Sequence, residues 1–366
     1  GALTLATRRR LSGAAFLHTA EYDTAIATYF AGGSDLDSPE ASGDDLPASL
    51  DVSLPLAQAL RYGENPHQKA GFYSDGAPYE VLHGKALSTN NLLDLTAALD
   101  LIGEFDNARP TVAILKHTNP CGVGQGETPE AAYRRAFATD TASPFGGIVV
   151  LNRPLDQATA EAINAVFTEI IIAPDYEDGV LGFLQKKKNR RLLTYAPQAS
   201  GENRLLLRSV AGGILAQEAD AALGTAAALR ERCSVATKRA PTDDEWAALD
   251  FAWRICKHVK SNAIVYGSGD AASGGWTLGI GAGQMSRIDA SEVAVRKAEK
   301  EDLDLTGSVV ASDAFFPFPD GLMAAADAGA RAAIQPGGSV RDAEVIEAAD
   351  ARGLAMVFTG QRHFRH

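Results

Sequence analysis

The sequence has few cysteines and no long hydrophobic run, and each shortage excludes a class of protein. Only three of the 366 residues are cysteines, at Cys121, Cys233 and Cys256. Three scattered cysteines do not make a disulfide framework, and no CxxC pair indicates a zinc site. No stretch approaches the roughly 20 apolar residues that a membrane-spanning helix needs, and no signal-peptide pattern is present. We therefore expect a cytoplasmic protein with reduced thiols.

The sequence also lacks an excess of positive charge. Its 34 lysines and arginines are outnumbered by 46 aspartates and glutamates, which gives a formal net charge of -12. Because this overall field repels a phosphate backbone, we expect no nucleic-acid partner, and we expect no membrane association. Local basic clusters that bind small anions stay open.

Short apolar runs that alternate with helical patterns are abundant, as are glycines, of which there are 35. This composition is typical of an α/β protein with roughly two domains. Apolar residues three or four apart predict a helix over residues 5–30, and the acidic stretch 33–53 predicts a linker. Strands are expected at 111–115, 147–151, 169–173, 261–267, 307–311 and 355–359.

A polar, helix-rich passage near residues 216–258 divides the region after the linker into two parts. A serine and aromatic turn beside a short apolar strand occurs in both parts, at residues 143–146 (SPFG) and 312–317 (SDAFFP). One such echo suggests duplicated units but does not establish them.

The segment LKHTNPCG, residues 115–122, carries the clearest chemical signal. The apolar run 112–115 predicts a strand buried on both faces, and Asn119-Pro120 is expected to end it. Lys116 and His117 then fall at the carboxyl end of the strand, where open α/β sheets bind ligands. A solvated lysine at the start of a loop is the alternative.

Three further segments carry polar groups with chemical potential. RYGENPHQ, residues 61–68, offers an arginine fork suited to a phosphate or carboxylate. Asn262 precedes an apolar run, where an amide suits a carbonyl or amine. SDAFFPF, residues 312–318, places a carboxylate beside three aromatic rings, which suits a flat heterocycle better than a metal. Surface turns and core packing are the alternatives.

Three other chemistries are disfavoured. Cys121 near His117 invites a Cys/His nucleophile, but the sequence shows no third orienting residue. Pro120-Cys121 matches the start of the zinc-deaminase PCxxC motif, but Gly124 stands in place of the second cysteine and no HxE element precedes it. The glycine-rich residues 279–283 lack the GxGxxG spacing, the lysine and the later acidic residue of nucleotide loops.

Together, these motifs resemble the transformylase part of the bifunctional AICAR transformylase/IMP cyclohydrolase family. The resemblance runs from about Leu54 to His366 through RYGENPHQ, LKHTNPCG, SPFGGIV, VKSNAI, GIGAGQMSR, SDAFFPF and FTGQRHFRH. The amino-terminal helix resembles the last helix of the cyclohydrolase domain. Most of that domain is missing from this chain, so we expect no cyclohydrolase activity.

The resemblance implies an α/β fold with two cytidine-deaminase-like units that lack zinc. It implies four parts: residues 1–32 as the residual cyclohydrolase helix, 33–53 as linker, 54–225 as the first unit and 226–366 as the second. It also implies a homodimer whose active sites combine residues of both subunits. A structural monovalent cation such as potassium is compatible with the family, but the sequence does not identify its ligands.

The implied activity is AICAR formyltransfer in de novo purine (IMP) biosynthesis. A formyl group passes from 10-formyltetrahydrofolate, the cosubstrate, to the 5-amino group of AICAR. The amine is a poor nucleophile, so we expect His117 to act as general base, Lys116 to stabilise the oxyanion and Asn262 to help hold the formyl group or amine. The alternative is a catalytically idle fragment that binds nucleotide or folate or serves in dimerisation.

The resemblance also implies binding residues, with no metal ligand among them. Those for AICAR are Arg61, Tyr62, Lys116, His117, Gly146, Arg362 and Phe364. Those for folate are Phe145, Asn262, Arg287, Ile288, Asp313, Phe315 and Phe316. The basic run 186–191 is either a polyglutamate-binding patch or a solvated loop.

Overall fold

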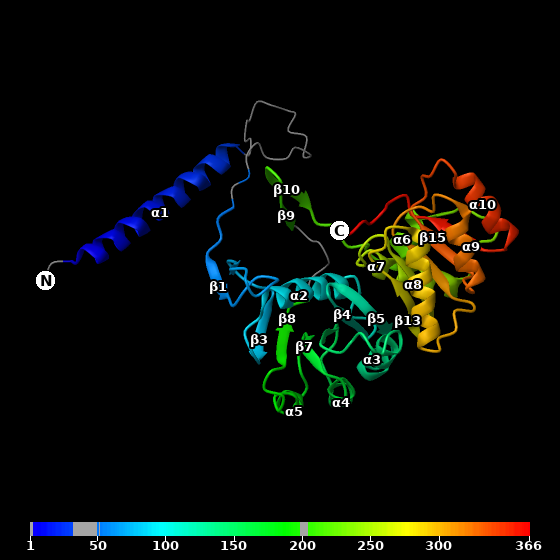
Figure 1. Cartoon of the computed structure of the whole chain (residues 1–366), viewed down its shortest axis with the longest axis horizontal. Coiled ribbons are helices and arrows are strands. Elements are labelled where there is room, and N and C mark those ends of the chain that lie inside the picture. The colour runs from blue at the N-terminus through cyan, green and yellow to red at the C-terminus, as the bar shows by residue number, and fades with distance from the viewer. Residues whose placement is uncertain (1–2, 32–49, 51, 198–203) are drawn as a thin grey trace. The chain divides into compact units, whose positions relative to one another are not determined.

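The computed structural model describes residues 3–31, 50, 52–197 and 204–366 and divides into two compact units, Gly1–Leu54 and Pro55–His366 (Figure 1). The expected linker, residues 33–53, lies almost entirely outside the described residues. Within the described ranges, no helix combines the length and apolar character that crossing a membrane requires.

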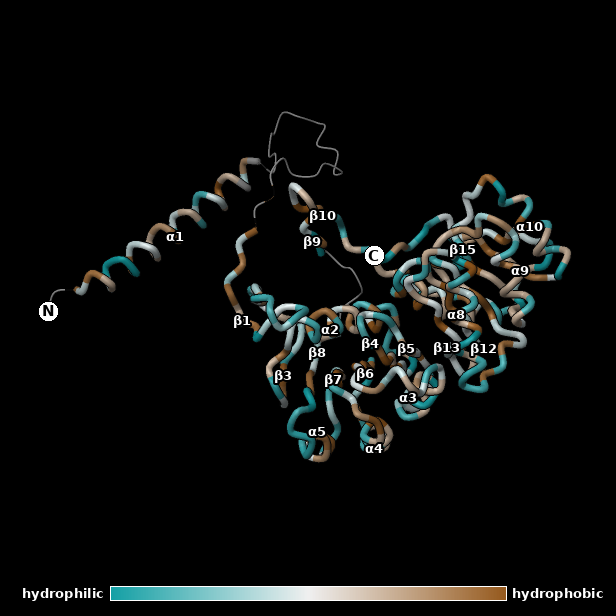
Figure 2. The backbone as a smooth tube through the Cα atoms, in the orientation of Figure 1, coloured by the Kyte–Doolittle hydropathy of each residue, from teal (hydrophilic) through white to brown (hydrophobic). Residues whose placement is uncertain are grey.

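The described part of the first unit is mainly one long helix, α1, from Leu5 to Ala31, which confirms the helix predicted over residues 5–30. Hydrophobic and hydrophilic residues are mixed along it (Figure 2). Its large apolar side chains are exposed, among them Phe16, Tyr22 and Phe30.

The second unit is an α/β structure built around one sheet of twelve strands, in the order β11-β16-β15-β14-β12-β13-β5-β4-β6-β7-β8-β3. Its strands are β3 Tyr79–His83, β4 Thr111–Lys116, β5 Asn119–Gln125, β6 Gly147–Leu151, β7 Thr168–Ala173, β8 Arg191–Tyr195, β11 Ser234–Val235, β12 Ile264–Asp270, β13 Gly274–Gly281, β14 Val309–Ser312, β15 Ala332–Gln335 and β16 Ala355–Phe358. Two separate hairpins complete the strands: β1 Leu56–Leu60 with β2 Ala70–Tyr73, and β9 Leu205–Val210 with β10 Gly213–Glu218.

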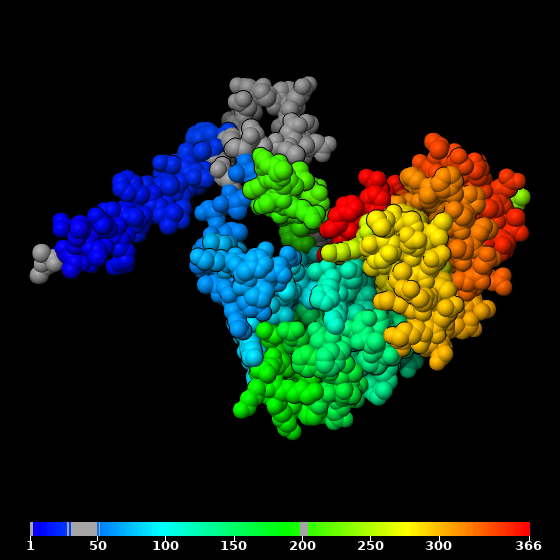
Figure 3. Space-filling view, in the orientation of Figure 1, coloured from blue at the N-terminus to red at the C-terminus, as the bar shows by residue number. Residues whose placement is uncertain are grey.

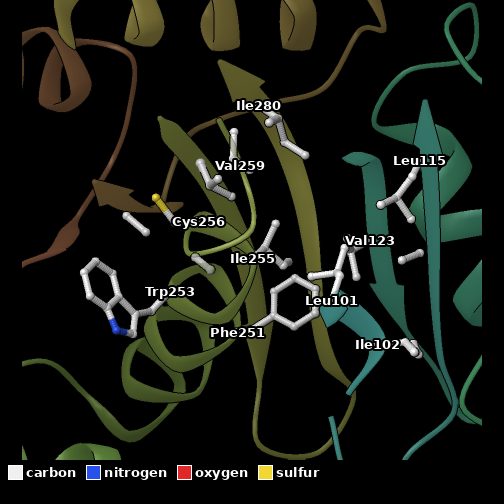
Figure 4. Packing of buried hydrophobic residues seen from close by; sticks show 14 of the residues in the cluster. Leu101, Ile102, Leu115, Val123, Phe251, Trp253, Ile255, Cys256, Val259 and Ile280 are labelled. Atoms are coloured by element: carbon white, nitrogen blue, oxygen red, sulfur yellow. The ribbon is translucent and has the colours of Figure 1, made fainter. Parts of the chain in front are cut away.

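Helices cover both faces of the sheet. They are α2 Thr89–Ile102, α3 Pro129–Ala138, α4 Gln157–Asn164, α5 Val180–Leu184, α6 Ala226–Arg232, α7 Asp243–Cys256, α8 Arg287–Lys300, α9 Pro319–Asp327 and α10 Asp342–Ala351. α2 and α7 share one core, in which Phe251 of α7 lies beside Leu101 of α2 and Val123 of β5 (Figure 4). The other face carries two cores, one under α3 to α5 and one under α8 to α10.

The two halves of the sheet repeat one order of elements. Each half has a helix, an antiparallel hairpin, a second helix, and then three parallel strands with helices between them: α2-β4-β5-α3-β6-α4-β7-α5-β8 and α7-β12-β13-α8-β14-α9-β15-α10-β16. β5 and β13 are antiparallel neighbours, so equivalent strands of the two halves run in opposite directions. The structure therefore contains a duplicated unit.

The inner strand of each half contains a Gly-x-Gly pair that lets a helix approach closely. A Cβ on Gly122 or Gly124 of β5 would meet the backbone oxygen of Ala136 or Ala132 of α3, at 2.0 and 2.6 Å. In the other half, a Cβ on Gly279 or Gly281 of β13 would meet the backbone oxygen of Ala294 or Ala290 of α8, at 2.5 and 1.7 Å. The glycine-rich motif therefore serves strand-helix packing.

The two halves meet at a seam between β5 and β13. Trp276 and Gly124 form the one residue pair that joins these strands in the ladder. Beside this pair, Oγ1 of Thr277 accepts a hydrogen bond from the amide of Val123 at 3.0 Å. The same hydroxyl group donates to the carbonyl oxygen of Val123 at 3.2 Å. A threonine side chain thus replaces part of the backbone pairing.

The six predicted strands are confirmed, with starts shifted from 261 to 264 and from 307 to 309 and with one misplaced turn. β12 begins at Ile264 rather than 261, because residues 261 and 262 hydrogen-bond with the carboxy-terminal segment and with Gln284. Asn119-Pro120 opens β5 instead of ending the preceding strand, and the turn lies at residues 117–118. The echo between SPFG and SDAFFP joins non-equivalent positions, since SPFG precedes β6 and SDAFFP continues from the end of β14.

Candidate functional site

The motifs gather at one edge of the sheet because the strands of the two halves run in opposite directions. This edge holds the carboxyl ends of β4, β13, β14 and β16 and the amino ends of β5, β6 and β12. A direct contact confirms the convergence, since the amide of Lys260, before β12, donates to Oδ1 of Asn119, at the start of β5, at 2.9 Å.

A strained two-residue turn presents the LKHTNPCG motif. Lys116 pairs with Asn119 across the hairpin, and the two residues between them, His117 and Thr118, have φ values of 51° and 64°. Positive φ at both central residues is what a type I′ hairpin turn requires, but it is rare for a β-branched residue such as threonine. Strain of this kind is concentrated at functional sites. His117 is exposed there and Lys116 is half-buried.

Helix α2 holds this turn from outside. Oδ1 of Asp94 accepts a hydrogen bond from the amide of Thr118 at 2.6 Å. Burial raises the pKa of Asp94, although the hydrogen bond from Thr118 and the charge of His117 oppose the shift. The same helix reaches RYGENPHQ, because Oγ1 of Thr89 donates to the carbonyl of Tyr62 at 2.9 Å. The guanidinium of Arg61 lies 5.6 Å from the ring centroid of Tyr62.

Lys116 reaches the SPFGG segment. Its Nζ donates to the carbonyl of Phe145 at 2.7 Å, and Gly146, with a φ of 76°, turns the chain into β6. The ring of Phe145 is 63% exposed and lies 5.2 Å from that of Phe167. One exposed aromatic face and one ammonium group therefore stand side by side at this edge.

The second half contributes a polar cluster of half-buried Asn262 with buried Arg287 and Asp313. The amide of Asn262, after a cis Ser261–Asn262 peptide bond, donates to the carbonyls of Gln284 and Met285 at 3.0 Å each. Its Oδ1 accepts two bonds from Arg287 at 3.2 Å. All hydrogen-bonding positions of this amide are thus occupied within the chain.

Arg287 and Asp313 form a buried ion pair with unused hydrogen-bonding capacity. Their side chains approach to 3.2 Å, and that of Asp313 is fully buried. Nε of Arg287 and Oδ2 of Asp313 have no hydrogen-bond partner among the described residues. Burial lowers the pKa of Arg287 and raises that of Asp313. A buried polar group without a hydrogen-bond partner destabilises the fold unless water, an ion or a ligand supplies that partner.

The aromatic residues expected on the folate side differ in exposure. Phe315 is 38% exposed, but Phe316 is 1% exposed and belongs to the core under α8 to α10. Ile288 is half-buried on α8. Phe315 is therefore available at the surface, whereas the ring of Phe316 is occupied by packing.

The carboxy-terminal segment, residues 359–366, lies extended along this edge and is called the tail below. Alternate residues face opposite sides, as in a strand. His363 is buried and Arg365 half-buried, whereas Arg362, Phe364 and His366 are exposed. The guanidinium of Arg362 lies 4.6 Å from the ring centroid of Phe364. In Figure 3 the red tail lies at the surface beside the yellow atoms of the second half.

The structure thus brings the predicted residues to one edge, but it does not link them all. Within the described ranges, no hydrogen bond or ion pair joins Arg61, His117 and Arg362 to one another. Sequence reasoning missed two supporting residues, Asp94 and Glu169, and considered Arg191, which meets Glu169 at 2.8 Å, only as part of the basic run 186–191. A single sequence carries no signal for them, because each acts through a partner 22 or more positions away.

Two alternatives are weakened by the structure. Cys121 is buried on β5, and burial raises the pKa of its thiol to about 12, which does not suit a nucleophile. The basic run 186–191 is split, since Arg190 is buried against Asn164 and Arg191 pairs with Glu169, while only part of it faces solvent. Among the described residues, no group of three or more His, Cys, Asp or Glu side chains is arranged to hold a metal.

Comparison with known proteins shows similarity along the whole chain. A family model described as AICARFT/IMPCHase bienzyme matches residues 1–297. The bifunctional purine biosynthesis protein PurH of Chlorobium luteolum is 53% identical over 375 residues, covering 100% of this chain and 68% of that protein. The protein of the same name from Chloroflexus aurantiacus is 55% identical over 368 residues, with the same coverage.

Proposed function

Because the chain belongs to the AICARFT/IMPCHase bienzyme family, we propose that it is an AICAR formyltransferase of purine biosynthesis that uses 10-formyltetrahydrofolate. The observation that carries the proposal is the strained turn of His117 and Thr118, which presents Lys116 and His117 at the edge where the other motifs meet. The cytoplasmic location and the two zinc-free, cytidine-deaminase-like units expected from the sequence stay part of the proposal. The duplicated order of elements supports such units.

Proton removal and charge stabilisation are the two tasks of the turn. His117 is exposed and takes the proton from the AICAR amine as the amine attacks the formyl carbon. Lys116 uses one of its three N–H donors on the carbonyl of Phe145, and the others serve the oxyanion that forms on the formyl group. As this intermediate collapses, the bond between the formyl carbon and N10 of the folate breaks, the proton held by His117 passes to N10, and tetrahydrofolate leaves.

Substrate binding is divided between the two halves. Arg61, Tyr62, Gly146 and the tail residues Arg362 and Phe364 bind AICAR, and Phe145, Ile288, Arg287, Asp313 and Phe315 line the folate side. Since the amide of Asn262 is fully occupied, we assign it the role of orienting Arg287 rather than holding the formyl group directly.

A homodimer is also part of the proposal. The β9–β10 hairpin is a two-stranded sheet, which is rarely stable alone. Its exposed large apolar residues are Leu205, Leu206, Leu207, Val210, Ile214 and Leu215. A second copy of the chain would cover such a surface. Sedimentation of the whole chain at assay concentration tests this, and a fully active monomer would refute sites shared between subunits.

A structural monovalent cation such as potassium stays part of the proposal, but the described residues do not identify its ligands. The carboxylate of Asp313, whose charge burial disfavours, already faces Arg287 at 3.2 Å.

The test of the proposed reaction is tetrahydrofolate formation from 10-formyltetrahydrofolate, with and without AICAR. We expect AICAR-dependent turnover in the parent chain and a loss of about two to four decades in His117→Asn. Asparagine tolerates the left-handed backbone of the turn, so the melting temperature should hold. His18→Asn, on exposed α1, is the matched control. A fully active His117→Asn variant would refute the assignment of His117 as the general base. A parent chain without AICAR-dependent turnover would favour the alternative, a catalytically idle binding module.

A further inference from the structure

A chain of three side chains reaches the tail from the side opposite its exposed residues. Glu104 follows α2, His258 follows α7, and Arg365 belongs to the tail. Nε2 of His258 lies 3.1 Å from Oε1 of Glu104, and Nδ1 lies 3.1 Å from Nη1 of Arg365. We infer that this Glu104–His258–Arg365 relay positions the tail so that Arg362 and Phe364 are ready to bind AICAR. The inference rests on the proposed function.

The extended shape of the tail makes this coupling direct. The backbone on both sides of Arg365 is fixed, since its carbonyl accepts from the amide of Ser261 at 3.0 Å and its amide donates to Oγ of Ser261 at 3.2 Å. Because side chains alternate along an extended chain, anchoring Arg365 on the inner side sets the direction of Phe364 and Arg362 on the outer side. A second anchor, His363, meets Asp220 at 2.5 Å.

The relay has one consistent arrangement of protons. A guanidinium group can only donate, so Nδ1 of His258 must accept from Arg365. Nε2 then carries the hydrogen and donates it to the carboxylate of Glu104. Burial lowers the pKa of His258, which favours this neutral form although Glu104 opposes the shift. If His258 were protonated, Nδ1 would carry a hydrogen and could not accept from Arg365, so the hydrogen bond to the tail would be lost.

The far end of the relay is rigid. Glu104 is fully buried and also meets Nζ of Lys257 at 2.5 Å. Oε2 of Glu104 accepts from the amide of Leu223 at 3.1 Å. Among the described residues, the charged side chains around His258 are Glu104, Lys257, Arg254, Arg365, Asp100 and Asp220, and each has a hydrogen-bonding partner. A fully hydrogen-bonded network of this kind is rigid, so it holds His258, and through it Arg365, in one position.

Arg365→Met tests the inference, because methionine keeps the stem and removes the donors. We expect KM for AICAR to rise about tenfold or more, with kcat falling less than about threefold and KM for 10-formyltetrahydrofolate changing less than about twofold. Arg365→Lys should recover part of the loss through its remaining charge. A general loss of structure would instead lower the melting temperature and alter all three constants.

Arg204→Met is the matched control. Arg204 pairs with Asp100 at 2.9 Å, the same carboxylate that meets Arg365 at 3.4 Å, but among the described residues it makes no hydrogen bond or ion pair with the tail. We expect its KM for AICAR to equal that of the parent chain within about twofold. Equal increases in Arg204→Met and Arg365→Met would assign the effect to Asp100 and overturn the relay.

A readout independent of turnover separates the relay from the proposed reaction. Carboxypeptidase Y should trim the tail faster in Arg365→Met and in His258→Gln than in the parent chain or Arg204→Met, as measured by mass spectrometry. A parent chain without AICAR-dependent turnover would refute the proposed function, and the trimming rates would still decide whether the relay holds the tail. Unchanged trimming, or an active Arg365→Met enzyme with the parent KM, would refute the relay.

Discussion

The two halves of the sheet share one order of elements, but each contributes the opposite end of its antiparallel hairpin to the candidate site. The first half presents its hairpin turn, with Lys116 and His117, at the edge of the sheet where the motifs gather. This edge and this turn are called the reactive edge and the reactive turn below. The equivalent turn of the second half, between β12 and β13, lies at the other edge, where Arg109 donates to the carbonyls of Ala271 and Ala272. A duplicated unit that is inverted within one sheet therefore produces an asymmetric site.

The two hairpin turns are also stabilised differently. Asp270 caps its own turn, since its Oδ1 accepts from the amides of Ala272 and Ser273 at 2.8 and 2.6 Å. The reactive turn has no such cap and relies on Asp94 of another element. The β12–β13 turn is therefore held both by its own Asp270 and by Arg109 of the first half, whereas the amide of Thr118 has its acceptor on another element.

The largest expected effect is a loss of stability when the buried carboxylate of Glu104, at the inner end of the relay, is removed. Glu104→Gln should lower the free energy of unfolding at pH 7 by about 3–5 kcal/mol, because it leaves the buried charge of Lys257 without its partner. Urea denaturation measures this. Glu347→Gln, on an exposed position of α10, is the control and should change stability by less than about 0.5 kcal/mol.

The difference between Glu104→Gln and the parent chain should depend on pH. Burial raises the pKa of Glu104, but His258 and Lys257 outweigh burial and hold it at about 2. A carboxyl group with a lowered pKa stabilises the fold above its unfolded pKa of about 4.5 and loses that contribution as the pH falls toward 2. The gap between parent and variant should therefore narrow between about pH 4.5 and pH 2, and a gap that widened there would contradict the pairing.

A smaller effect should compare the strand-helix contacts of the two halves. Gly281→Ala places Cβ 1.7 Å from the carbonyl oxygen of Ala290, whereas Gly124→Ala places it 2.6 Å from that of Ala132. Both should destabilise by about 1–3 kcal/mol, with Gly281→Ala the worse. Thermal unfolding gives the order. Gly182→Ala in α5, where no atom lies within 4 Å, should be neutral or slightly stabilising, and equal losses at all three sites would refute the packing argument.

The smallest effect tests the outside support of the reactive turn. Asp94→Ala should lower kcat for formyl transfer about tenfold, because the backbone of Thr118 loses its acceptor and the turn loses its position. Asp94→Asn keeps an acceptor oxygen and should recover most of the rate. Asp270→Ala, in the equivalent turn at the other edge, should leave kcat unchanged. A comparable loss in both alanine variants would mean that neither turn is specific to catalysis.

Local sequence predicted much of this structure and missed what depends on distant partners. Helix α1 followed from apolar periodicity, although its large apolar side chains are exposed, and the strands at 147–151 and 169–173 followed from continuous apolar runs that the sheet buries. The turn was placed two residues late, because Asn119-Pro120 is a common turn sequence and only tertiary contacts impose positive φ on His117 and Thr118.

The duplication was suspected for the wrong motif. The true repeat is a pair of glycines two apart facing a pair of alanines four apart, as in Gly124 and Ala132 of one half and Gly281 and Ala290 of the other. A glycine-rich string alone suggests a ligand loop, and only the helix that follows shows that the missing side chains make room for packing. The roles of Asp94 and His258 had no local signal, because each acts through a contact far along the chain.

The seam at Trp276 and Gly124 has a consequence for how the protein must be made. Separating the halves there would expose β5 and β13 as bare sheet edges, which invite pairing with other chains. Each separated piece would also keep only part of the reactive edge, with His117 on one and Arg287 on the other. Because the seam joins strands that lie far apart along the chain, we expect the two halves to aggregate when they are produced as separate polypeptides.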